Sequence, residues 1–104
     1  MKSDFNADSC FRHTDSVAFR RIADEILLVP VRSDSRQKLG IYTLNRVGSA
    51  VWELIDGTRK LAEVIEAVCS RFKVDSETAR RDTELFCQEL LSFGAIEAAL
   101  QETS

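Results

Sequence analysis

The stretch Y-T-L-N-R-V-G-S-A-V-W-E-L-I-D-G, residues 42–57, contains a strand end, a helix start and a helix stop. Asn45 is a good helix cap, because its side-chain oxygen can accept a backbone N–H of the first turn. One apolar helical stripe follows it, made of Val47, Ala50, Val51, Leu54 and Ile55. Asp56-Gly57 ends the helix, since glycine adopts left-handed backbone freely. The stretch therefore predicts a strand that leads through a tight corner into an amphipathic helix.

Two more amphipathic helices follow this corner. The apolar stripe of the first consists of Leu61, Val64, Ile65, Val68 and Phe72. The second is capped by Asp75 or Ser76 and ends at Gly94. Its main stripe consists of Ala79, Phe86, Leu90 and Phe93, with Asp82 as a polar interruption. No helix is apolar all round, so each must bury one face against the others and against a sheet.

Short strands precede the corner. Residues 17–22 give a weak strand signal, residues 26–31 are a β-branched apolar run, and residues 39–44 read as a third strand. Pro30 is expected at a strand end, a bulge or an edge, because proline cannot donate to a ladder. Three sequential short strands favour an antiparallel meander. The fold class is α+β: a three-stranded antiparallel sheet packed on three helices.

The chain of 104 residues is expected to form one domain. Residues 17–98 form that domain, residues 1–16 a mobile N-terminal tail, and residues 99–104 a C-terminal tail.

The net charge of -3 weakens a nucleic-acid function, which usually needs a basic face. No apolar run reaches the about 18–20 residues of a membrane span, and the N-terminus lacks a signal-peptide core. We expect a cytoplasmic protein that is a monomer or a weak dimer.

Catalytic residue patterns are not found in the sequence. Ser49 follows Gly48 but lies in no G-x-S-x-G motif, and His13, the single histidine, falls in the predicted tail. The three cysteines form no C-x-x-C pair, and we interpret Cys69 and Cys87 as small hydrophobic residues of the helices. The sequence therefore predicts a protein that is not an enzyme and has no cofactor or metal.

A binding function is expected to use the third strand and the third helix. A second stripe of this helix mixes charged and apolar residues, which suits the wall of a groove. If the strand over residues 40–44 is a sheet edge, its backbone can accept a further strand. Cover by the N-terminal tail or by a second copy is the alternative. The predicted peptide-binding residues are Gly40, Ile41, Tyr42, Thr43, Leu44, Arg80, Thr83, Glu84, Cys87 and Leu91.

The ordered series of motifs resembles the PqqD-like family over roughly residues 17–96. The matching residues are Leu44, Asn45, Gly48, Val51, Trp52, Leu54, Ile55, Asp56 and Gly57, then Leu61, Glu63 and Val64, then Ala79, Asp82, Phe86, Leu90 and Gly94. The resemblance implies a small winged helix-turn-helix. It also implies a recognition element for ribosomally made, modified peptides, in which a leader peptide adds a strand to the third strand and lies against the third helix.

The resemblance further implies that a separate peptide-modifying enzyme, often a radical SAM protein, acts on the presented peptide. The pathway that the resemblance implies is that of pyrroloquinoline quinone (PQQ) or a related one. Two departures from the family pattern are noted: Lys60 stands where a capping Thr or Ser is common, so Thr58 is expected to cap, and Thr83 and Cys87 replace hydrophobic residues. A winged-helix DNA-binding protein that uses Arg80 and Arg81 is the alternative, and a dimerisation module that uses the same edge is a third reading.

Overall fold

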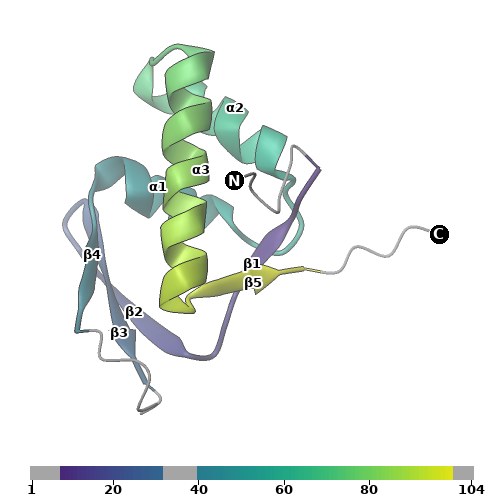
Figure 1. The fold of residues 1–104 in the computed structure, drawn as a ribbon. Coiled ribbons are helices and arrows are strands. Elements are labelled where there is room, and N and C mark those ends of the chain that lie inside the picture. The colour runs from purple at the N-terminus through teal and green to yellow at the C-terminus, as the bar shows by residue number, and fades with distance from the viewer. Residues whose placement is uncertain (1–7, 32–39, 100–104) are drawn as a thin grey trace.

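In the computed structural model, which describes residues 8–31 and 40–99, a three-stranded sheet packs against the first of three helices, and the three helices pack against one another (Figure 1). The elements in chain order are β1 (Phe11–His13), β2 (Val17–Ile22), β3 (Glu25–Pro30), β4 (Tyr42–Leu44), α1 (Arg46–Leu54), α2 (Leu61–Phe72), α3 (Ser76–Phe93) and β5 (Ile96–Ala98). The α+β architecture with a three-stranded antiparallel sheet and three helices is the one that the sequence predicted.

The sheet has the order β2-β3-β4, and both pairs are antiparallel. The first predicted strand is confirmed at both ends, and β3 ends at Pro30 opposite Val17, which confirms a strand-end proline. β4 is shorter than predicted, since residues 40 and 41 lie outside it. The all-polar stretch of residues 33–38, for which the sequence predicts a loop, lies outside the described residues.

The predicted caps set the helix starts. Oδ1 of Asn45 accepts the N–H of Gly48 at 2.9 Å, and the side chain of Asp75 accepts the N–H of Thr78 at 3.3 Å. The expectation that Thr58 caps α2 is wrong, because Lys60 occupies the cap and its N–H donates to Oε1 of Glu63 at 2.8 Å.

The helix ends follow the predicted glycines in one case only. Gly94 has a φ of 85° and closes α3. α1 already ends at Leu54, before Asp56-Gly57. Gly57 does have a φ of 87°, but its N–H donates to the carbonyl of Phe11 at 2.9 Å, so this turn connects α1 to the N-terminal segment.

The core lies between the helices and the inner face of the sheet. Its largest fully buried side chains include Trp52, Ile26, Leu28, Leu44, Leu61 and Leu90. Trp52 is 1% exposed and therefore packs inside the domain. Gly48 allows α1 to approach α3, because a Cβ built on it would lie 2.5 Å from Cε1 of Phe86. None of the helices in the described ranges combines the length and hydropathy that a bilayer span requires.

The N-terminal segment differs from the expected tail. β1 pairs antiparallel with β5, and Arg12 aligns with Glu97 in that pair and forms a salt bridge with it. Cys10 and Phe11 are buried, at 4% and 5% exposed. Residues 10–13 are thus part of the domain. A three-residue strand whose partner lies at the far end of the chain leaves too short a local pattern for sequence analysis to detect.

Candidate functional site: a groove between β4 and α3

β4 is an edge of the sheet. It pairs with β3 through Ile26–Leu44, Leu27–Thr43 and Leu28–Tyr42. Over residues 8–31 and 40–99, no strand pairs with its other side, and the N-terminal strand β1 lies in the separate pair with β5. An edge strand presents unpaired N–H and C=O groups that can accept another strand.

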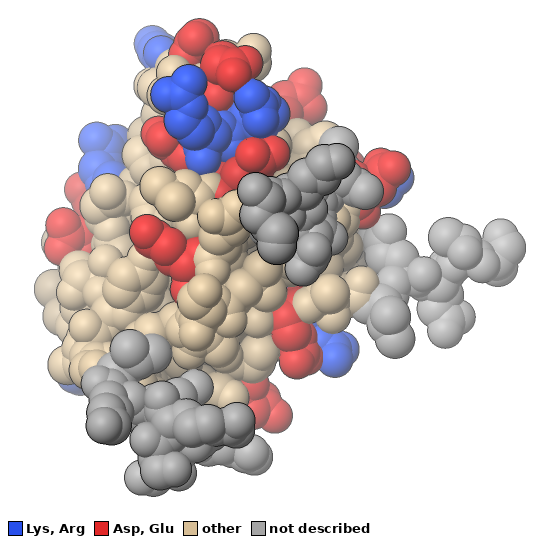
Figure 2. Space-filling model, in the orientation of Figure 1, with Lys and Arg blue, Asp and Glu red and all other residues tan. Residues whose placement is uncertain are grey.

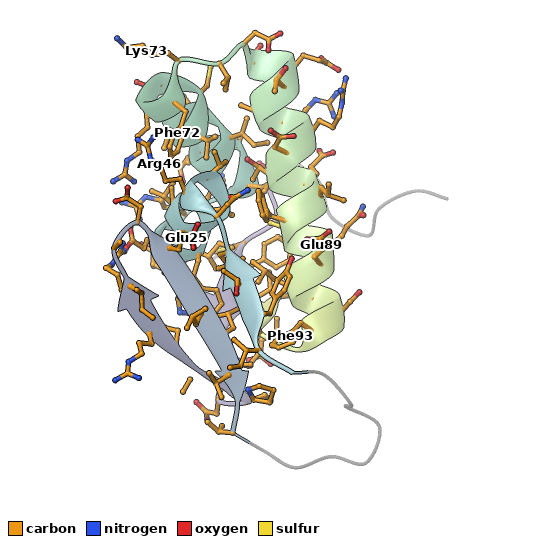
Figure 3. The ribbon with its side chains drawn as sticks, turned by 90° about the vertical axis from the view of Figure 1, so that its left-hand side faces the viewer. Glu25, Arg46, Phe72, Lys73, Glu89 and Phe93 are labelled. Atoms are coloured by element: carbon orange, nitrogen blue, oxygen red, sulfur yellow. The ribbon has the colours of Figure 1, made fainter. Side chains whose placement is uncertain are left out.

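A hollow of about 550 Å³ lies beside this edge. Its lining residues are Gly40, Ile41, Tyr42, Gln88, Glu89, Ser92 and Phe93. Figure 3 shows Glu89 and Phe93 on the part of α3 that runs alongside β4. Ile41 is 62% exposed, although large apolar side chains are usually buried. The strand edge and the hollow together form a groove, called here the β4–α3 groove.

Tyr42 connects the two walls of the β4–α3 groove. Its hydroxyl donates a hydrogen bond to Oε1 of Glu89, and its ring lies 5.3 Å from the ring of Phe93, centroid to centroid. Burial, together with the hydrogen bond and negative charge of Glu89, raises the pKa of Tyr42 to about 12. The hydroxyl therefore remains protonated at neutral pH and fixes the position of the Glu89 carboxylate.

The predicted residues of the third strand are only partly in the groove. Gly40, Ile41 and Tyr42 line the hollow. Thr43 is an exposed residue of β4, opposite Leu27. Leu44 is 0% exposed and belongs to the core, so it can take part through its backbone alone.

The predicted residues of α3 do not lie in this groove. Thr83 and Cys87 are both 0% exposed, and a bound peptide cannot contact their side chains in this conformation. Burial, with a smaller effect of Glu84, raises the pKa of Cys87 to about 12, so this thiol stays protonated. Leu91 is half-buried and packs against the core.

Arg80 and Glu84 line a different hollow, of about 390 Å³, together with residues of α2. The predicted stripe therefore belongs partly to the core and partly to the side of α3 that faces α2. The β4-facing side is the opposite flank of the same buried stripe. Helical periodicity fixes only the angles between residues of one helix. It therefore cannot tell which of the two flanks of α3 faces β4.

The groove residues of α3 that sequence analysis missed are Gln88, Glu89, Ser92 and Phe93. They are spaced i, i+1, i+4 and i+5, so they share one side of the helix. Leu85 lies one turn before Glu89 and is 53% exposed. A leucine outside the main apolar stripe was the one feature of the sequence that could have pointed to a binding surface on this flank of α3.

Arg80, one of the two basic residues of α3, is locally neutralised. Nη2 of Arg80 lies 2.7 Å from Glu77, and its Nη1 lies 3.4 Å from Glu84. Figure 2 shows acidic groups among the basic ones over the upper part of the molecule, where α2 and α3 lie in Figure 1. A recognition helix for DNA needs cations that are available to phosphates. This charge distribution does not favour the DNA-binding alternative.

Comparisons with known proteins bear on the fold and on the family of the chain. The chain is similar to a solved structure titled TbiB1 in complex with the TbiA(beta) leader peptide. The match has 27% sequence identity and a TM-score of 0.70, and it covers 86% of this chain and 99% of the other. No curated protein sequence matches the chain significantly. The family model of PqqD, coenzyme PQQ synthesis protein D, matches residues 25–96, and the chain therefore belongs to the PqqD family.

Proposed function

We propose that this protein is a non-catalytic binding protein that captures the leader of a ribosomally made precursor peptide. The leader adds a strand to the open edge of β4, and its side chains enter the β4–α3 groove. The bound precursor is then presented to a separate modifying enzyme, in the cytoplasm, in the pathway of PQQ or a related peptide-derived product. One observation carries the proposal: among the described residues no strand covers the outer edge of β4, and a hollow of about 550 Å³ lies beside this edge, in a chain similar to a leader-bound protein.

The energetics require both walls of the groove. Four or five ladder hydrogen bonds contribute about 0.5–1.5 kcal/mol each. Micromolar affinity corresponds to about -8 kcal/mol after the cost of association. Contact with the apolar surface of Ile41, Tyr42 and Phe93 must therefore supply much of the affinity.

NMR titration of the isotope-labelled protein tests the proposal. The probes are leader peptides encoded beside the gene of this protein. We expect saturable shifts of amides in residues 40–44 and 88–93 and small shifts on the α2 side of α3, at Arg80 and Glu84. Shifts that map only to other surfaces, or no saturable binding by any of these leaders, would contradict the proposal.

A matched pair of substitutions separates the two flanks of α3. Ser92→Trp places a large side chain in the hollow, and we expect an affinity loss of about tenfold or more without unfolding, because Ser92 is exposed. Arg80→Ala, on the α2-facing flank, is the control and should leave the affinity within about twofold. Equal effects of the two variants would show that the groove assignment is wrong.

A further inference from the structure

The wall of the β4–α3 groove is negatively charged. Among the described residues that line the hollow, Glu89 is the one that carries a charge; its neighbours Gln88, Ser92 and Ile41 are neutral. A carboxylate offers about four acceptor sites on its two oxygens. The hydrogen bond from Tyr42 to Oε1 uses part of this capacity and holds the group in place, so acceptor capacity remains for a cation.

The spacing of the apolar and acidic groups on α3 matches that of an extended peptide. Phe93 and Glu89 are four residues apart, a rise of about 6 Å along the helix. Alternate side chains of a strand lie about 6.5–7 Å apart on one face. Figures 1 and 3 both show β4 running alongside α3, so a strand added to β4 would run along this wall.

We infer that the groove selects leader segments in which a lysine or arginine lies two residues from an apolar residue. The apolar side chain would pack against Phe93 and Tyr42, and the basic side chain would pair with Glu89. Asp82, seven residues before Glu89, lies on the same side of α3 by helical spacing and adds to the negative potential. An acidic side chain at the same position of the leader would meet like charge and is selected against. The inference rests on the proposed function and names its substrate class.

A display selection with random linear peptides tests this inference and does not depend on the sequence of the natural leader. We expect wild-type protein to enrich peptides with a basic residue at a fixed separation of two from an apolar one. An enriched peptide is then synthesised with Lys, Gln or Glu at the basic position. The expected order of affinity is Lys, Gln, Glu, with about threefold to tenfold between the extremes at low salt, because the pair is exposed to solvent.

Variants of Glu89 give the decisive comparison. Glu89→Gln should abolish the preference among the three peptides, and Glu89→Lys should reverse it. Glu77→Gln is the matched control, since Glu77 is an exposed glutamate of α3 that pairs with Arg80 away from the hollow, and it should keep the wild-type order. All three variants change surface residues, and circular dichroism confirms that each variant is folded.

The outcomes separate this inference from the proposed function. Peptides that shift the amides of residues 40–44 but bind equally well with Lys, Gln or Glu would overturn the charge selectivity and leave the peptide-binding function standing. The same holds if Glu89→Lys fails to reverse the order. A selection that yields no peptide able to shift these amides would overturn both.

Discussion

The imidazole of His13 stacks on the indole of Trp52, with 3.6 Å between the ring centroids and 8° between the ring planes. Nε2 of His13 also donates a hydrogen bond to the carbonyl oxygen of Trp52 at 2.9 Å, and the ring of Phe19 meets both rings edge-on. These contacts join β1 to α1 and β2. A residue that sequence analysis assigned to the tail is therefore part of the packing of the domain.

Stability should depend on the protonation of His13. Burial lowers its pKa below 6.5, against the opposing effects of the Trp52 carbonyl and Asp56. Because the folded-state pKa is below that of the unfolded chain, the unfolded state binds the proton first as the pH falls. The contribution of neutral His13 is thus fully present above about pH 6.5 and is lost as the pH falls toward the folded-state pKa.

Urea denaturation between about pH 7.5 and about pH 5.5 measures this dependence. We expect the free energy of unfolding of the wild type to decrease over this range more than that of His13→Phe, which keeps an aromatic ring on Trp52 but does not titrate. Identical slopes for the two proteins would contradict the assignment. His13→Ala should cost about 1–2 kcal/mol at neutral pH, from the lost ring stacking and hydrogen bond.

Gly48→Ala should destabilise the protein by about 1 kcal/mol. The added Cβ would lie 2.5 Å from Phe86, and overpacking costs about 1–3 kcal/mol, which exceeds the gain in helix propensity of about 1 kcal/mol. In a Phe86→Ala background the same substitution should become neutral or stabilising, because the clash is absent. Gly40→Ala, with no atom within 4 Å of the new Cβ, is the steric control. Chemical denaturation of these variants and the wild type gives the comparison.

Thr83→Val should raise the stability by about 1 kcal/mol and leave peptide affinity unchanged. Thr83 is 0% exposed, and its Oγ1 is one of the buried side-chain atoms in the described part of the chain that lack a hydrogen-bond partner. Replacing an unpaired buried hydroxyl with a methyl group removes a desolvation cost. Thermal denaturation and a peptide titration check the two halves of this prediction. A change in the affinity for the peptide would indicate that Thr83 takes part in binding.

The thiols should differ in reactivity in the native protein. Cys87 is buried with its pKa raised to about 12, and Cys10 is 4% exposed, whereas Cys69 is half-buried and its Sγ donates to the carbonyl of Val74. Because the thiolate is the reactive form, alkylation should modify Cys69 first. Mass spectrometry of peptides after timed treatment with iodoacetamide identifies the order. Rapid modification of Cys87 would show that α3 opens from the core.

Local signals in the sequence were sufficient for most of the helices and for the first strand. Asn45 and Asp75 begin helices, and Gly94 ends one, because capping depends on a few neighbouring residues. The alternation and β-branching of residues 17–22 and 26–31 likewise reflect local backbone preference. The order of these elements was enough to predict an α+β fold with a meander, and the motif residues within them carried the resemblance to the family.

The sequence by itself thus determined the three helices, the strands β2 to β4 and the order of these elements. That β4 is an edge, uncovered by any strand of the described residues, was decided by the tertiary structure. The tertiary structure decided which flank of α3 faces that edge and brought residues 10–13 into the domain. Periodicity defines the buried stripe of α3, but the rotation of the helix about its axis relative to β4 depends on simultaneous packing against α1, α2 and the sheet. The close approach of Phe86 to Gly48 and the hydrogen bond from Tyr42 to Glu89 show how α3 is rotated about its axis. In this rotation Glu89 lies in the groove and Cys87 lies in the core.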